Sequence, residues 1–290
     1  MIECPEKRWI NTSGLRKTKG GNYVPSLSPA AAYLVPCGKC GICRMKKQSE
    51  WKFRIYHEMR TQTMPGYFVT LTYNRKSLPW SEGLPSLRFK DVQDFLKRLR
   101  FHGHKAKYLC TGEYGPTTQR PHYHLCIWTD ATPDDLTKHW KNGSIHVGAL
   151  TLASALYALK YIMNPTPKKE WNDPRERPRA QYSKGLGLGY LTINMYNYHT
   201  DDDNGRKYKR FEGYADGDIV PLPRYYINKI FTTRERRWHR AQSAAKAARR
   251  RLEFCRDTGM SQVEAERYLE DLNRSLATDL IKSNKKNQTL

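Results

Sequence analysis

Segments of strand length and helix length alternate along residues 67–163, and this alternation restricts the fold more than any other feature of the sequence. Apolar residues recur at helical spacing in some segments, whereas others are short runs of β-branched and aromatic residues. The expected helices are 41–61, 89–101, one begun by Thr132 and Pro133, and 152–163; the expected strands are 67–73, 107–111, 121–128 and 144–149. We therefore predict an α+β fold in which helices pack on a central antiparallel sheet.

Changes in composition divide the 290 residues into four predicted segments. Within the third, the stretch 164–190 combines Pro, Gly and many charges, so we expect a mobile or irregular loop that serves as a DNA-facing lid. Residues 234–251 are very basic and 261–281 amphipathic, which predicts accessory helices outside the core. The segments are 1–62 with a cysteine knuckle and a helix, 63–165 as catalytic core, 166–232 as loop-rich extension and 233–290 as basic helical region.

The charge of the chain favours a polyanionic partner. Lys and Arg number 51 against 28 Asp and Glu, a formal net charge of +23. Each phosphate that a basic side chain neutralises releases condensed counterions, so nucleic acid is the first candidate. The 19 Tyr and 7 Trp offer faces on which unpaired bases can stack. The alternative is a solvated basic surface, and the same alternative applies to the basic helix 234–251.

The sequence favours a protein of the cytoplasm without a membrane partner. No apolar run approaches the roughly 20 residues that span a bilayer, and the first residues, Met1 to Cys4, lack the apolar stretch of a signal peptide. Seven cysteines are an odd number, and three of them are clustered. This distribution fits metal binding in a reducing compartment better than a disulfide framework.

The clustered cysteines are Cys37, Cys40 and Cys43, each separated from the next by two residues. This spacing lets thiolates share one metal ion, usually tetrahedral zinc, which needs a fourth ligand. Cys4 is available, although it is distant in the sequence. We predict a structural Zn²⁺ site that joins the N-terminus to the knuckle; an iron–sulfur cluster or thiols without a metal are the alternatives.

Two histidines in the segment 121–128 are candidate ligands of a second metal. Successive side chains of a strand point to opposite faces, so His122 and His124 share one face. Imidazoles bind divalent metals, and a nearby carboxylate would complete a three-ligand site with open positions. Glu113 ends the preceding strand, and the following turn can bring it beside the histidines. A His-x-His pair also occurs without any metal. Apolar residues are expected on the opposite face: Tyr123, Leu125 and Ile127.

The predicted helix 152–163 carries Tyr157, Lys160 and Tyr161 at i, i+3 and i+4, which places them on one face. A tyrosine hydroxyl can attack a metal-polarised phosphate, forming a phosphotyrosyl link and freeing a 3′-hydroxyl. Two tyrosines one turn apart permit two successive transfers. The alternative is that both rings simply pack against the sheet.

The order of these motifs resembles the HUH endonucleases of the rolling-circle replication type. The resemblance implies that Glu113, His122 and His124 hold Mg²⁺ or Mn²⁺, that both tyrosines are nucleophiles and that Lys160 lies near the scissile phosphate. It rests on three motifs: the threonine strand Phe68-Val69-Thr70-Leu71-Thr72-Tyr73, the strand His122-Tyr123-His124 preceded by Gly112-Glu113-Tyr114-Gly115, and the tyrosine helix.

A closer resemblance is to the replication initiators of gokushoviruses, small single-stranded DNA phages of the microvirus group. It covers roughly residues 33 to 165, from the run Pro36 to Arg44 onward, with a weaker likeness at 223–226. It implies an endonuclease with strand-joining activity that starts and ends rolling-circle replication at the phage origin in the host bacterial cytoplasm, with a host polymerase and helicase as partners. Where related tyrosine helices continue with lysines, this chain has Asn164-Pro165, so no second lysine is carried over.

Two other functions fit the same residues. An HUH transposase or plasmid initiator would use the same chemistry in a different genetic setting. A non-catalytic, zinc-bearing DNA-binding protein would use the histidines and tyrosines only for structure. The last of these predicts that no covalent adduct with DNA forms under any metal condition.

Overall fold

The computed structural model describes residues 3–5, 7–11, 16–17, 23–24, 32–163, 171–200, 202–203, 206–207 and 209–286. The chain forms two compact units. One combines segments from both ends of the chain, within Met1–Lys47 and Thr233–Leu290, and the other lies within Gln48–Thr232. The four segments that we predicted from composition divide the sequence differently, and that division stays a prediction.

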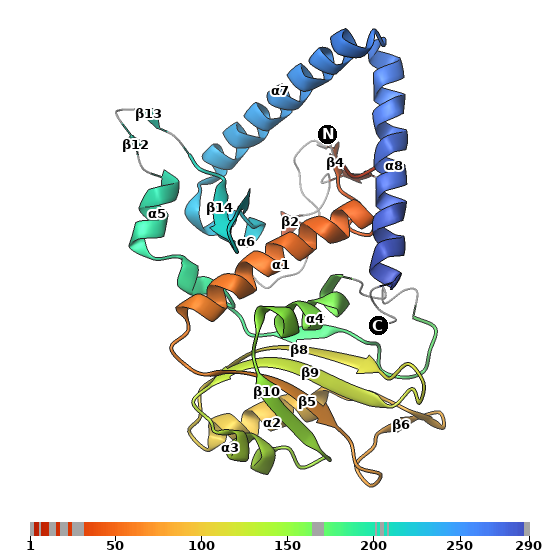
Figure 1. The fold of residues 1–290 in the computed structure, drawn as a ribbon, viewed down its shortest axis with the longest axis vertical. Coiled ribbons are helices and arrows are strands. Elements are labelled where there is room, and N and C mark those ends of the chain that lie inside the picture. Colours follow the sequence, from red (N-terminus) through yellow and green to blue (C-terminus); the bar gives the residue numbers. More distant parts are fainter. Residues whose placement is uncertain are drawn as a thin grey trace. The chain divides into compact units, whose positions relative to one another are not determined.

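The central unit is built on a five-stranded sheet (Figure 1). The strands lie in the order β10-β5-β9-β8-β11, and every neighbouring pair is antiparallel. Eight α-helices occur among the described residues, so the predicted α+β class is confirmed. The strand bounds are β5 Gly66–Thr72, β8 Ala106–Tyr114, β9 Pro121–Thr129, β10 Ile145–Ala149 and β11 Ala180–Tyr182.

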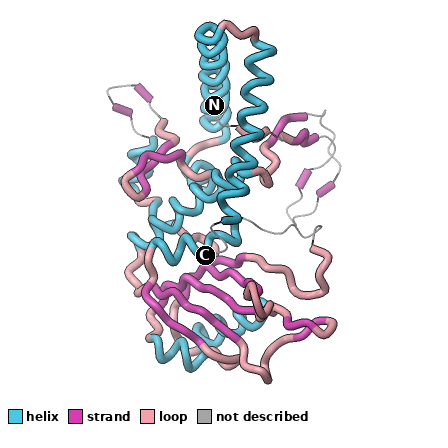
Figure 2. Tube along the Cα trace, turned by 45° about the vertical axis from the view of Figure 1, so that its right-hand side comes forward, coloured by secondary structure: helices cyan, strands magenta, loops and turns pink. Residues whose placement is uncertain are grey.

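Helices cover both faces of this sheet, as the tube in Figure 2 shows. One face packs against α2 (Phe89–Phe101) and α3 (Pro133–His139), and the other against α4 (Leu152–Met163) and part of α1 (Gly41–Thr61). The predicted alternation along β9 is confirmed. The side chains buried toward α2 are Tyr123, Leu125 and Ile127, and those buried toward α4 are Cys126 and Trp128.

The start of α3 follows from its local sequence. The Thr132 hydroxyl accepts a hydrogen bond from the Asp135 amide at 3.2 Å, and the Asp135 carboxylate accepts one from the Thr132 amide at 3.0 Å. This reciprocal capping box satisfies two amides that have no partner within the helix. Pro133 is the first helical residue, where its missing N–H costs nothing. The predicted helix start is therefore confirmed.

The prediction of an irregular loop over 164–190 was wrong in part. Residues 180–182 form β11, which pairs with Leu109 to Thr111 of β8 and adds a fifth strand to the sheet. A strand of three residues is too short to produce a readable alternation, and Pro, Gly and charged neighbours hid it. Residues 164–170 lie outside the described residues, so the predicted lid stays a prediction.

The rest of the central unit packs around the second half of α1. Its core contains Phe53 of α1, and Tyr226, which is fully buried and donates a hydrogen bond from its hydroxyl to the Gly187 carbonyl at 2.7 Å. The elements of this part are η2 Leu188–Tyr190, α5 Ile193–Thr200, β12 Asp202–Asp203, β13 Arg206–Lys207, β14 Glu212–Ala215, β15 Asp218–Pro221 and α6 Arg224–Ile230; β6 Trp80–Ser81 and β7 Leu84–Pro85 form a small hairpin before α2.

The unit made from the chain ends contains two long helices, α7 (Thr233–Thr258) and α8 (Gln262–Lys286). They confirm the helical C-terminal region that the sequence predicted. No residue of α7 is buried. The N-terminal part contributes two strand pairs, β1 (Arg8–Asn11) with β4 (Ala32–Val35) and β2 (Arg16–Lys17) with β3 (Tyr23–Val24). No helix in the described residues combines the length and the apolar character needed to cross a bilayer.

Candidate functional site

The register of the sheet brings the three predicted ligands together. Glu113 of β8 lies directly opposite His122 of β9, and His124 lies opposite Thr111. Directly opposite residues share a face, as do residues two apart on one strand. Glu113, His122 and His124 therefore project from the middle of the sheet toward the face that α4 covers.

The three side chains converge on one point. The Glu113 Oε1 atom lies 2.6 Å from His124 Nε2 and 3.1 Å from His122 Nε2. One potential ligand atom from each residue lies within 4.8 Å of the others. Glu113 is 4% exposed and His124 9% exposed, so the centre is largely withdrawn from water on the protein side.

The second ring nitrogen of each histidine is also held. His122 Nδ1 lies 3.2 Å from the Arg120 carbonyl oxygen, which can only accept, so this nitrogen carries the proton. In a neutral His122, Nε2 then directs a lone pair at the Glu113 carboxylate. Either the ring is protonated or a cation lies between the two atoms. His124 Nδ1 contacts the Thr70 hydroxyl at 3.1 Å, which gives the threonine strand a role in orienting this ring.

Tyr157 of α4 lies beside this centre. Its ring stands edge-on to the His124 ring, with the centroids 5.2 Å apart, while Phe68 stacks on His124 at 5.5 Å. Tyr157 is 45% exposed, so it is not simply buried against the sheet. Lys160 and Tyr161 occupy the next turn of the helix backbone, but their side chains lie outside the described part of the structure. Their predicted roles stay predictions.

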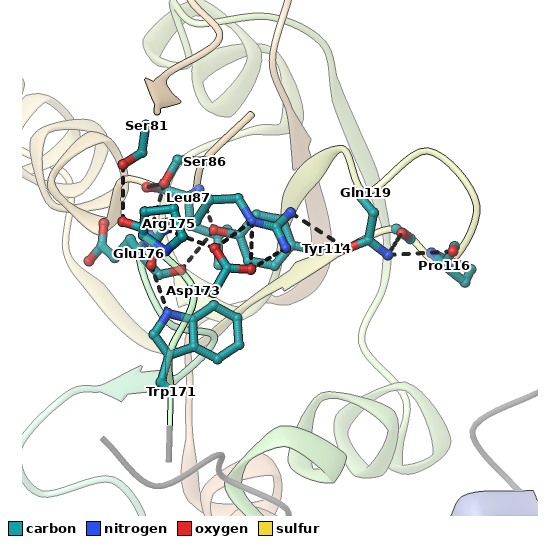
Figure 3. A network of polar contacts seen from close by, with 12 residues as sticks. Ser81, Ser86, Leu87, Tyr114, Pro116, Gln119, Trp171, Asp173, Arg175 and Glu176 are labelled. Carbon is teal, nitrogen blue, oxygen red and sulfur yellow. Dashed lines mark hydrogen bonds and ion pairs between the residues drawn. The ribbon is translucent and has the colours of Figure 1, made fainter. Parts of the chain in front are cut away.

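A network that the sequence did not predict fixes the strand end after Glu113 (Figure 3). The Tyr114 hydroxyl donates to the Glu176 carbonyl at 2.8 Å and accepts from the Leu87 amide at 3.1 Å. The Arg175 guanidinium lies 4.1 Å from the centre of the Tyr114 ring, and Trp171 stacks on the same ring. Sequence offered one clue, the aromatic residue beside a candidate ligand in Gly-Glu-Tyr-Gly.

Gly112 is needed on the other side of Glu113. A Cβ atom at this position would lie 2.8 Å from the Phe89 ring and 3.0 Å from Leu87. Both neighbours are buried core residues, so neither can yield easily. The small residue therefore lets helix α2 pack closely under the strand that carries the carboxylate.

The four predicted cysteines also meet, in the unit made from the chain ends. Cys4, Cys37, Cys40 and Cys43 are all buried, and their sulfur atoms lie within 4.8 Å of one another. The structure therefore brings a cysteine from the N-terminal segment to the knuckle that precedes α1. Cys110 and Cys126 are fully buried in the sheet, apart from this cluster.

Comparison with known proteins places the histidine strand and the tyrosine helix in one family region. Residues 66–166 match the family described as replication-associated protein ORF2. This range begins at β5, contains Glu113 and both histidines, and ends just after α4.

The chain is similar over most of its length to phage proteins of this kind. It is 28% identical over 263 residues to the replication-associated protein ORF2 of Spiroplasma virus 4, covering 80% of this chain and 75% of that protein. It is 29% identical over 238 residues to the replication-associated protein VP4 of Bdellovibrio phage phiMH2K, covering 72% and 71%. The replication-associated protein ORF4 of Chlamydia phage 1 is 25% identical over 192 residues, covering 55% and 46%. No solved structure matches the chain. The resemblance to gokushovirus-type replication-associated proteins is confirmed.

Proposed function

We propose that this chain initiates the replication of a small single-stranded DNA phage by nicking the origin through tyrosine attack. The observation that carries the proposal is the convergence of Glu113, His122 and His124 beside a solvent-accessible Tyr157. The similarity to phage replication-associated proteins supports the role in replication. No membrane partner is part of the proposal.

Glu113, His122 and His124 would hold Mg²⁺ or Mn²⁺. The donor set fits such an ion because it combines one carboxylate oxygen with two imidazole nitrogens. The neutral form of His122 fits it as well, since its lone pair and the carboxylate face each other across 3.1 Å. When bound, the ion would polarise the phosphate and stabilise the negative charge that develops on its oxygens.

The proposed reaction is a transesterification in which bonds are exchanged without net hydrolysis. The Tyr157 oxygen attacks phosphorus and loses its proton, the bond from phosphorus to the 3′ oxygen breaks, and that oxygen takes up a proton. The 5′ end of the DNA is then joined to the tyrosine, and the free 3′-hydroxyl can prime a host polymerase assisted by a helicase. Tyr161 would serve the second transfer, which cuts the regenerated origin while the displaced strand is resealed. Lys160 would lie near the scissile phosphate.

Nicking can be tested with labelled single-stranded DNA from the origin region, Mn²⁺ and a denaturing gel. We expect a covalent adduct with the wild type, and its loss by on the order of 10³-fold or more in His122→Ala and in the double variant Tyr157→Phe/Tyr161→Phe. Tyr196→Phe is the matched control, because Tyr196 is 46% exposed, nearly as much as Tyr157, but lies on α5.

The single variants test how the tyrosines share the reaction. Adduct formation that survives either single Tyr→Phe change but not the double change would support alternating roles. An adduct that survives the double change would overturn the mechanism. DNA binding without any adduct, at any origin-region sequence and with either metal, would favour the non-catalytic DNA-binding protein.

A further inference from the structure

The four-cysteine cluster has the spacing of thiolates around one ion. Cys40 Sγ lies 3.7 Å from Cys4 Sγ, and Cys37 Sγ lies 4.0 Å from Cys43 Sγ. Two sulfurs bound to one tetrahedral zinc at about 2.3 Å are separated by roughly 3.8 Å. A disulfide would require about 2.05 Å. The distances therefore match a shared metal and exclude disulfides in this structure.

The backbone around the knuckle is arranged to receive negatively charged sulfur. The amides of Lys39 and Cys40 both donate to Cys37 Sγ at 3.3 Å, and the amide of Cys37 donates to Cys4 Sγ at 3.2 Å. Gly38 makes the tight turn possible, since its φ of +75° lies in the left-handed region that favours glycine. Amides directed at sulfur stabilise thiolates, the form in which cysteine binds a metal.

Helix α8 packs directly on this cluster. Ala277 and Leu280 lie against the cysteines. The Glu3 amide donates to the buried Asn273 side chain at 3.0 Å, which fixes the backbone beside Cys4. A Cβ atom at Gly41 would lie 2.2 Å from the Ala277 carbonyl oxygen, so this close approach requires glycine. The cluster thus joins three segments that are distant in the sequence.

This unit has little else to hold it together. Among its side chains that the structure describes, the buried apolar ones are Ile42, Ala265, Ala277 and the four cysteines. A core this small does not offset the conformational entropy of ordering two helices of 26 and 25 residues. Binding of a structural metal supplies folding free energy directly.

We propose that Cys4, Cys37, Cys40 and Cys43 bind a structural zinc ion that ties the N-terminal segment and the start of α1 to helix α8. Four thiol protons are released as the ion binds, and no oxidant or reductant is required. The site is chemically separate from the histidine centre, because thiolates favour zinc whereas carboxylate-containing sites suit Mg²⁺ and Mn²⁺. The proposal does not depend on nuclease activity.

The first test is the metal content of the purified full-length chain, measured by elemental analysis after dialysis against a weak chelator. We expect about one zinc per chain in the wild type and its loss in Cys4→Ser. Cys4→His offers a replacement ligand and should retain zinc; a cavity of about 420 Å³ that Cys4 lines provides room for the larger ring. Cys255→Ser, outside the cluster on α7, and His122→Ala, in the other centre, should both retain it.

The second test follows the link to α8 by limited proteolysis. A strong chelator should make α7 and α8 at least about tenfold more susceptible to trypsin, because the segments that hold them are released. Zinc, but not Mg²⁺, should restore protection, and the central sheet should resist cleavage throughout. This readout remains informative if Cys4→Ser folds poorly, since it uses the wild-type chain.

Several results would overturn the proposal. These are a chain without zinc, iron accompanied by acid-labile sulfide in place of zinc, undiminished zinc in Cys4→Ser, or chelation that leaves the protection of α8 unchanged. A failure of nicking alone leaves all four readouts intact. The two proposals can therefore fail independently.

Discussion

At the scale of single residues, buried histidines in this protein have distinct tasks that their hydrogen bonds define. His122 and His124 present Nε2 to a carboxylate, whereas His199 is fully buried and uses both ring nitrogens in the fold. Its Nδ1 donates to the Arg210 carbonyl and its Nε2 accepts from the Tyr190 hydroxyl, each at 2.7 Å. Only the neutral ring satisfies both contacts.

His199 is expected to make stability depend on pH. Burial lowers the pKa of His199 below its usual value of 6.5, so below this pH the unfolded chain takes up a proton that the folded chain resists. The free energy of unfolding is therefore expected to be highest above about pH 6.5 and to fall as the pH drops toward the lower folded pKa.

Urea denaturation at about pH 7.5 and about pH 5.5 measures this effect. His199→Gln keeps an N–H donor but does not titrate, so the loss of stability between the two pH values should become smaller. It should not vanish, because burial lowers the pKa of His57 and His139 as well. The exposed His146→Gln is the control. Equal pH dependence in both variants would mean that His199 does not contribute.

At the scale of secondary structure elements, the segment after residue 170 acts on a strand distant from it in sequence. Arg175 pairs with Asp173 and covers the Tyr114 ring, next to Glu113. We expect Arg175→Ala to weaken Mn²⁺ binding by about tenfold, because groups that orient a ligand typically contribute this much.

Isothermal titration with Mn²⁺ would test this expectation, with thermal unfolding measured in parallel. Lys184→Ala also removes one positive charge but lies on an exposed site beyond β11, so it should leave both quantities unchanged. A lower melting temperature with unaltered Mn²⁺ affinity would show that the network stabilises the fold without positioning Glu113.

The elements differ in how far their sequence determines them. The three helices 41–61, 89–101 and 152–163 were predicted with the observed bounds, because each has a sustained apolar period and clear end signals. The period-2 pattern around the histidines likewise predicted which face holds the ligands. Strand β11, the small hairpins and the Arg175 network depend on contacts between distant segments, which leave no local pattern. The meeting of Cys4 with the knuckle was inferred only from the need for a fourth ligand.

At the scale of the whole molecule, the net charge of +23 has one accessible concentration on α7, of which no residue is buried. We expect the triple variant Arg237→Gln, Arg240→Gln and Arg250→Gln to weaken binding to single-stranded DNA. The slope of log affinity against log salt should become shallower by about 2, since each phosphate contact on a single strand contributes roughly 0.7.

Fluorescence anisotropy over a range of salt concentrations would measure this slope. The control removes the same charge from exposed lysines on the side of the sheet away from the histidine centre, Lys97, Lys105 and Lys138. If both triple variants changed the slope equally, the attraction would reflect overall charge, and α7 would not be a particular DNA contact.

The unit assembled from both chain ends also imposes an order on protein synthesis. Cys4 and the knuckle leave the ribosome before the whole of the central sheet, whereas α8 follows it. Segments of a nascent chain fold as they become complete, so the central sheet can form while the N-terminal cysteines still await Ala277 and its neighbours. A ribosome that stalls within the last helix would therefore hold a finished histidine centre and an unfinished cysteine cluster.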